Sequence, residues 1–151
     1  MLRKKERLKG VHSDLVSLWL ALEADGHHMI LVEGLRTEKR QRELVSSGAS
    51  RTMTSKHLKQ ADGFSHATDV IPCSPKGEID WDDTEAFRAF REVVLAKAKA
   101  LGVRVRHGAD WDMNNIIDEL EIKAYIKKIG RRPLVDYPHW ELVSTSKRKG
   151  K

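Results

Sequence analysis

Histidine and carboxylate side chains that could hold a metal ion lie in two separated parts of the chain. The stretch SKHLKQADGFSHATD, residues 55–69, carries His57 and Asp69, and DYPH near the end of the chain carries His139. Two neutral imidazoles and one carboxylate leave a bound zinc ion with net positive charge, which polarises a water in the fourth position. His57, Asp69 and His139 therefore offer the ligands of a hydrolytic zinc site.

A hydrolytic site also needs a group that accepts the proton of the attacking water. Asp136 lies three residues before His139 in DYPH, and Pro138 restricts Tyr137 to an extended backbone. The spacing suits a general base at Asp136, and it suits an ordinary loop residue before a strand equally well.

The other candidate ligands have weaker support in the sequence. Cys73 is the single cysteine, so any metal site must be built from histidine and carboxylate. His12, His27 and His28 stand at the edges of predicted elements without a carboxylate neighbour, and we expect them to be structural. His107 ends a predicted strand, where it could line a cleft.

Composition places the chain among globular proteins of one domain, with 151 residues, 40% hydrophobic and 33% charged. The net charge is +6, and basic residues gather in RKKERLK at the start and SKRKGK at the end. These ends are either solvated and flexible or attracted to a polyanion such as an anionic cell envelope. Aromatic residues do not interleave with a basic stripe, so we expect no nucleic-acid partner.

The apolar run LVSLWLAL, residues 15–22, decides whether a targeting segment is expected. It follows a basic start, as in a signal peptide, but no apolar run in the chain is long enough to span a membrane. Val11, Leu15, Leu18 and Leu22 fall on one helical stripe. We therefore expect a packed amphipathic helix, no transmembrane segment and no signal peptide.

Start and stop signals predict three helices, one from a Ser13 cap to about residue 24, one from a Thr37 cap to near Gly48, and one from a capping box of Asp82 and Glu85 to Gly102. The third helix has an apolar face made of Phe87, Phe90, Val94, Ala98 and Leu101. A fourth helix is expected over residues 115–128. Strand patterns occupy about residues 28–33, 66–72, 103–106 and 139–143. This mixed order predicts an α+β fold, with a small antiparallel sheet packed against helices.

Six pieces of the chain, taken in order, resemble the LAS metallopeptidases, the group of the D-Ala-D-Ala peptidases. They are VEGLRT, SKH, HATDVIP, GEIDW, RHGADW and DYPHWEL. Within the group the chain is most similar to the L-alanyl-D-glutamate peptidase endolysins of bacteriophages. The resemblance implies a Hedgehog/DD-peptidase-like fold over a single catalytic domain, residues 1–151. The basic composition of the two ends predicts that about residues 1–10 and 144–151 are flexible.

The resemblance also implies roles for individual residues. His57, Asp69 and His139 would bind zinc, and Asp136 would be the general base. Arg36 of GLRT would lie near the site and offset negative charge that develops on the substrate. Residues expected to contact or flank the substrate are Ser55, His66 and Trp140.

An insertion separates the first two expected ligands. Eleven residues lie between His57 and Asp69, about five more than the family usually has, and the polar segment 58–65 has the character of a loop that can lengthen without moving either ligand. Asp62 and His66 lie in or beside it and are alternatives to Asp69 as the second ligand. If HATDV is a strand, however, His66 and Asp69 point to opposite faces. We therefore expect Asp69 to be a ligand and His66 not to be one.

The function implied by the resemblance is a zinc endopeptidase that cuts the L-alanyl–D-glutamate bond of peptidoglycan stem peptides. Such an endolysin would act as a monomer at the cell wall after release from the host cytoplasm. A D,D-carboxypeptidase or dipeptidase of the same fold is one alternative. A non-catalytic wall-binding module is another, although it would not need Asp136.

Overall fold

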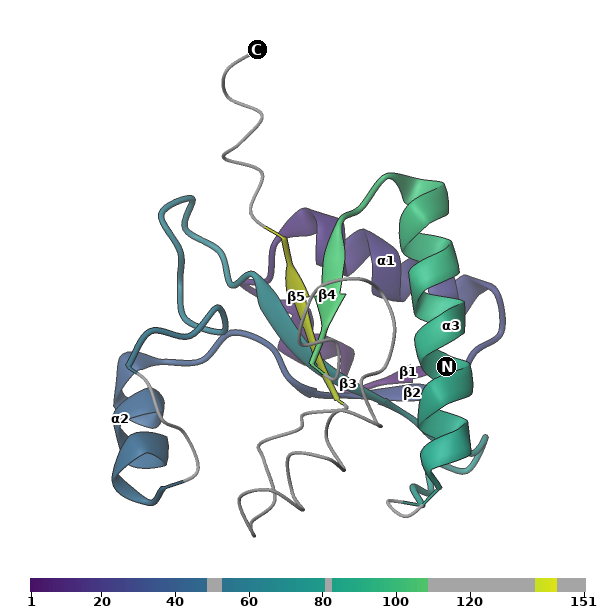
Figure 1. The fold of residues 1–151 in the computed structure, drawn as a ribbon, viewed down its shortest axis with the longest axis horizontal. Helices are drawn as coiled ribbons and strands as arrows, with labels where there is room; N and C mark the ends of the chain where they lie inside the picture. Colours follow the sequence, from purple (N-terminus) through teal and green to yellow (C-terminus); the bar gives the residue numbers. More distant parts are fainter. Residues whose placement is uncertain (49–52, 81–82, 109–137, 144–151) are drawn as a thin grey trace, which may run out of the picture.

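A five-stranded sheet forms the centre of the part of the chain that the computed structural model describes, residues 1–48, 53–80, 83–108 and 138–143 (Figure 1). The strands lie in the order β1-β2-β3-β5-β4 and span Leu2–Arg3 (β1), Met29–Glu33 (β2), Ala67–Pro72 (β3), Val105–His107 (β4) and His139–Leu142 (β5). Neighbouring strands are antiparallel except β1, which pairs with β2 in parallel. The α+β prediction is confirmed, with one parallel edge strand added to the antiparallel sheet.

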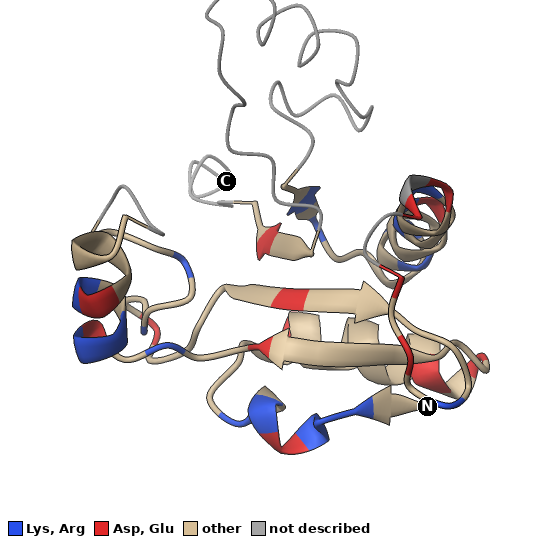
Figure 2. Ribbon diagram, turned by 90° about the horizontal axis from the view of Figure 1, so that it is seen from below, with Lys and Arg blue, Asp and Glu red and all other residues tan. Residues whose placement is uncertain are grey.

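The helices within the described residues are a 3-10 helix, Lys5–Leu8 (η1), and three α-helices, Ser13–Ala24 (α1), Glu38–Ser46 (α2) and Thr84–Leu101 (α3). Helices α1 and α3 share one apolar core with the sheet, where the rings of Trp19 and Phe90 stack at 6.4 Å. Helix α2 lies on the opposite side of the molecule from α3 (Figures 1 and 2). The predicted helix at 115–128 falls outside the described residues.

The run LVSLWLAL forms most of α1, and its Leu15, Leu18 and Leu22 are fully buried, as the helical stripe predicts. Among the helices that the structure describes, none is both long and apolar enough for a membrane crossing.

The first residues of the chain, in the segment 1–10 that the sequence predicted to be flexible, take part in the sheet and in a 3-10 helix. Leu2 is 1% exposed and pairs with Met29. Its backbone N–H donates to Glu23 Oε2 at 2.7 Å, and Lys5 Nζ lies 2.6 Å from the other oxygen of that carboxylate. A two-residue strand carries no periodicity that a sequence could show. The other predicted flexible segment, 144–151, lies outside the described residues.

Two helices begin one residue away from the predicted cap. In α1 the cap is His12, whose Nδ1 accepts a hydrogen bond from the Asp14 backbone N–H at 3.0 Å, and Ser13 is already helical. In α3 the cap is Asp83 rather than Asp82. Adjacent side chains that can all accept a hydrogen bond make such one-residue errors common in sequence reading.

The start of α2 and the end of α3 agree with the sequence. Thr37 Oγ1 accepts from the Arg40 backbone N–H at 3.1 Å, and Gly102 ends α3 with a φ of 72°. This left-handed conformation suits glycine because it has no Cβ. Leu101, predicted to lie on the buried face of α3, is instead 45% exposed.

Candidate metal centre

Strands β3 and β5 bring two of the expected ligands together. Asp69 lies opposite His139 in their register, and Thr68 lies opposite Trp140. Because successive side chains of a strand point to opposite faces, Asp69 and His139 share one face of the sheet. Thr68 and Trp140, both fully buried, point to the other face, and Thr68 accepts a hydrogen bond from the Trp19 indole at 2.9 Å.

His57 reaches this face from the loop that follows α2. It is 2% exposed, and its Nε2 lies 3.1 Å from Oδ1 of Asp69. Its Nδ1 lies 2.8 Å from the backbone oxygen of Gly34, which can only accept, so Nδ1 carries the proton. The backbone oxygen of His57 accepts from the Arg36 N–H at 2.8 Å. The imidazole is therefore held with its Nε2 lone pair toward Asp69.

His139 is oriented in the same way by a different partner. Its Nδ1 lies 3.2 Å from Oδ1 of Asp69, and its Nε2 lies 2.8 Å from Oε1 of Glu141. When a neutral His139 donates its Nε2–H to the carboxylate of Glu141, its Nδ1 lone pair points at Asp69. A carboxylate or carbonyl that fixes the outer nitrogen in this way is typical of histidines that bind metal.

Three acceptors thus converge on one point. His57 Nε2, His139 Nδ1 and an oxygen of Asp69 all lie within 4.8 Å of one another. Neutral imidazoles in these tautomers would set two lone pairs against a carboxylate, an arrangement that a cation stabilises. The donor set and its partial burial fit a divalent metal ion with nitrogen and oxygen ligands.

Burial and the neighbouring side chains act in opposite directions on the pKa values of the two carboxyl groups. Burial by itself raises the pKa of Asp69, but the hydrogen bonds that His139 and His57 donate when protons rather than a metal ion lie between them outweigh it and hold that pKa well below its ordinary value. Burial likewise raises the pKa of Glu141, and His139, Lys56 and Arg106 together lower it below the ordinary value. Both side chains are therefore carboxylates at neutral pH.

Arg36 lies beside the cluster with its guanidinium already engaged. Its Nε donates to Glu33 Oε2 at 3.0 Å, its Nη2 donates to the other oxygen of Glu33, and its Nη1 donates to Gln41 Oε1 at 2.7 Å. Glu33 is opposite Asp69 in the register of β2 and β3. Contacts with other described residues use three of the five guanidinium N–H groups, so Arg36 is fixed next to the site and two donors are left without a partner among those residues.

Ser55 and Asp136 complete the set expected from SKH and DYPH. Ser55 Oγ accepts from the His57 backbone N–H at 3.2 Å, which holds the turn that presents His57. Asp136 lies outside the described residues, so its position stays a prediction from the sequence.

Trp140 was expected to contact substrate, and the structure places it differently. Its side chain is fully buried on the core side of β5, with its ring 4.5 Å from that of His107 and 6.3 Å from that of Trp19. It packs behind His139 and has no exposed surface to offer. His107 is also buried, at 2% exposure, rather than lining a cleft.

His66 belongs to a second group of side chains. Its Nε2 lies 2.7 Å from Oδ2 of Asp62, and His12 Nε2 lies 3.7 Å from the same oxygen. His12 therefore has a carboxylate neighbour, contrary to the expectation from the sequence. His66 and Asp62 are grouped with each other and with His12, whereas Asp69 is grouped with His57 and His139.

Two groups that orient the imidazoles were missed from the sequence. Glu141 could have been found, because His139 and Glu141 are two apart in a predicted strand and must share a face. The backbone oxygen of Gly34 carries no signal in the sequence, since its contact with His57 depends on how distant segments pack.

One family model, two curated relatives and one solved structure that resemble this chain are all described as L-alanyl-D-glutamate peptidases. The family model of the phage L-alanyl-D-glutamate peptidases matches residues 2–143. The L-alanyl-D-glutamate peptidase of Escherichia phage T5 is 33% identical over 109 residues, 70% of this chain and 75% of the relative. That of Listeria phage A118 is 36% identical over 109 residues, which is 72% of this chain but 34% of the longer relative. The crystal structure of the Serratia marcescens L-Ala D-Glu endopeptidase ChiX superposes with a TM-score of 0.68 at 31% identity, over 95% of this chain and 90% of ChiX.

Proposed function

The chain belongs to the phage L-alanyl-D-glutamate peptidase family, and we propose that it is a zinc-dependent endopeptidase that hydrolyses the L-alanyl–D-glutamate bond of peptidoglycan stem peptides. The observation that carries the metal assignment is the convergence of His57 Nε2 and His139 Nδ1 on Asp69 Oδ1, at 3.1 and 3.2 Å, with the outer nitrogen of each imidazole engaged by an acceptor. The three side chains are the proposed zinc ligands.

Each residue of the site has a distinct task in this proposal. A bound zinc supplies Lewis acidity to the scissile carbonyl and lowers the pKa of a water. Asp136 accepts the proton of the attacking water and passes it to the leaving amine. The two guanidinium donors that Arg36 retains face negative charge that develops on the substrate. Ser55 holds the turn before His57 and stays a candidate substrate contact, as does His66 at the edge of β3.

A basic groove next to the site suits an anionic substrate. Residues lining it include Gly34, whose oxygen holds His57, together with Arg7, Lys9, Arg40 and Lys59. Lysines and arginines are prominent on η1 and α2 (Figure 2). A stem peptide brings carboxylates, beginning with that of its D-glutamate, and positive charge in a groove attracts such a ligand. We assign this groove to the part of the peptide that does not react.

In this proposal the enzyme acts on the bacterial cell wall, where its net charge of +6 favours contact with an anionic envelope.

Digestion of purified peptidoglycan, followed by mass analysis of the products, tests the bond that is cut. We expect stem peptides that begin at D-glutamate, with L-alanine left on the muramyl sugar. A chelator should stop the reaction and zinc should restore it. Release of terminal D-alanine alone would instead assign the D,D-carboxypeptidase activity, and binding to the wall without any product would assign a non-catalytic module.

A further inference from the structure

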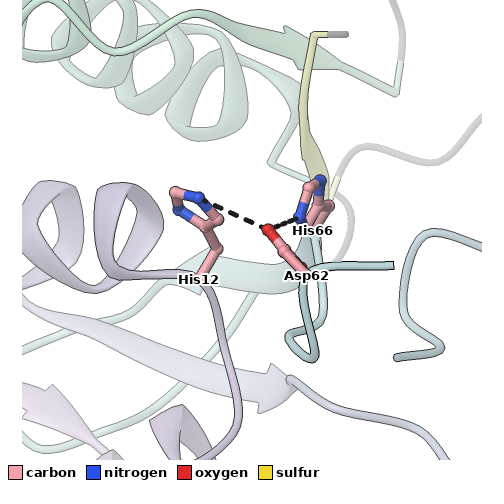
Figure 3. A group of neighbouring side chains, drawn as sticks. All are labelled: His12, Asp62 and His66. Carbon is pink, nitrogen blue, oxygen red and sulfur yellow. Dashed lines mark hydrogen bonds and ion pairs between the residues drawn. The ribbon is translucent and has the colours of Figure 1, made fainter. Parts of the chain in front are cut away.

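A second group of metal-ligating side chains lies outside the proposed active site. It consists of His12, at the start of α1, with Asp62 and His66 from the loop before β3 (Figure 3). One nitrogen of each imidazole and one carboxylate oxygen all lie within 4.8 Å of one another. The donor types are those of the His57–Asp69–His139 group, two imidazoles and one carboxylate.

The carboxylate of Asp62 is oriented before any metal binds. Its Oδ1 accepts the backbone N–H of Phe64 at 3.1 Å, which closes a turn in the loop. Its Oδ2 is left to face the imidazoles, 2.7 Å from His66 Nε2 and 3.7 Å from His12 Nε2. Figure 3 shows both rings directed at this one oxygen.

The backbone holds the two sides of the group together. The His12 N–H donates to the Ser65 oxygen at 2.9 Å, and the Ser65 N–H donates to the Gly10 oxygen at 2.8 Å. These bonds fix the residue before His66 against the residues around His12. The three side chains are therefore brought together by main-chain contacts, and a metal would not have to order the segment.

We propose that His12, Asp62 and His66 form a second binding site for zinc or a similar divalent transition metal, which joins the loop at residues 58–65 to the start of α1. The side chains of this group are 25%, 41% and 26% exposed, so water can fill the remaining coordination positions. Nitrogen and oxygen ligands of this kind suit zinc and its neighbours better than calcium or magnesium.

The distances are those of a site that needs little adjustment. Ligand atoms about 2.0–2.1 Å from a tetrahedral zinc lie roughly 3.3 Å from one another. The two separations from Asp62 Oδ2, 2.7 and 3.7 Å, fall on either side of that value. To match that value, the distance from Asp62 Oδ2 to His66 Nε2 would lengthen and the distance to His12 Nε2 would shorten.

Metal binding through Nε2 would require the ring proton of His12 to be on Nδ1. Its Nδ1 now accepts from the Asp14 N–H, whereas coordination through Nε2 places the proton on Nδ1. Oδ2 of Asp14 lies 4.0 Å from that nitrogen and can accept a hydrogen bond from its N–H after a small rotation of the Asp14 side chain. A carboxylate behind a ligating imidazole is a common outer partner of metal sites.

The second site lies on the loop that connects two proposed ligands of the active-site zinc. The loop runs between His57 and Asp69, and both of its ends lead to a proposed zinc ligand. A metal that ties its middle to α1 would limit the motion of the loop without taking part in the reaction. The site itself does not depend on the proposed peptidase function.

Zinc stoichiometry tests the proposal. Proteins are equilibrated with zinc chloride, freed of unbound metal on a desalting column and analysed by atomic emission. We expect two zinc ions per chain in the unaltered protein, one in Asp62→Asn, one in His139→Ala and none in the double variant. Asp25→Asn is the matched control, because it removes a carboxylate of similar exposure, 45% against 41%, and should leave two.

Two results would overturn the second site: two zinc ions retained by Asp62→Asn, which would mark the extra metal as adventitious, or none retained by His139→Ala. If His139→Ala kept two while Asp62→Asn lost one, the second site would stand and the proposed catalytic ligands would fail. His66→Ala provides an independent variant if Asp62→Asn does not fold, and it should also lose one zinc ion.

Discussion

Asp69 and His139 face each other across β3 and β5, with Oδ1 of the first 3.2 Å from Nδ1 of the second. This pairing depends on register, because side chains of a strand alternate between faces. A slip of one residue would put buried Trp140 opposite Asp69 and turn His139 into the core. The burial of Trp140 therefore helps to specify the register that places His139 in the site.

Removal of His139 should cost both metal and catalysis. We expect His139→Ala to lose one zinc ion per chain and to show no release of stem peptides above background, while its circular dichroism spectrum stays that of the unaltered protein. An active His139→Ala protein would show that the ligand set is wrong.

Glu141 should act through His139. Glu141→Gln keeps the size of the side chain but replaces a charged acceptor 2.8 Å from His139 Nε2 with a neutral one. We expect zinc affinity at the active site to fall by roughly 10–100-fold, measured by competition with a chromogenic chelator. Glu43→Gln, an exposed position on α2, is the control and should not alter affinity.

Asp136→Asn should separate metal binding from chemistry. The amide is similar in size but cannot take a proton, so zinc content should stay unchanged while turnover falls by roughly 10²–10⁴ if Asp136 is the general base. Turnover near that of the unaltered protein would assign the base to another group, and Glu141 would then be the first to test.

The basic groove should govern binding of substrate more than its turnover. Arg40→Glu reverses a charge in the groove, so we expect KM to rise with little change in kcat. Arg42→Glu reverses a charge on the same helix but outside the residues that line the groove, and it serves as the matched control. Equal effects of the two variants would point to general charge attraction rather than to this groove.

Glu23 should link the stability of the N-terminal segment to pH. The hydrogen bond with Lys5, aided by that with the Leu2 N–H, lowers the pKa of its carboxyl. A lowered pKa in the folded state means that the ionised form stabilises the fold at neutral pH and that this contribution is lost as pH falls below about 4. Glu23→Gln should therefore unfold at lower urea concentration at pH 7, and the difference should shrink towards pH 3. A constant difference across this range would exclude the ionised carboxylate as its cause.

The sequence by itself predicted those parts of the fold that depend on neighbouring residues. The apolar stripe of Leu15, Leu18 and Leu22 indicated α1, and Thr37 and Gly102 marked a helix start and a helix end, because periodicity and capping are local. It also supplied the candidates for the metal centre, since only certain side chains can bind zinc. The alternation of side chains along a strand also predicted that Asp69 and His66 point to opposite faces of the sheet.

Tertiary structure decided which segments, distant in the chain, come into contact. The parallel pairing of Leu2 with Met29, the contact of His57 with the Gly34 oxygen, and the approach of His12 to Asp62 join residues far apart in the chain. Such contacts depend on how elements pack, and packing leaves no pattern within either segment alone. The same holds for Trp140, whose type suited both a substrate contact and a core residue until the register of β5 assigned it to the core.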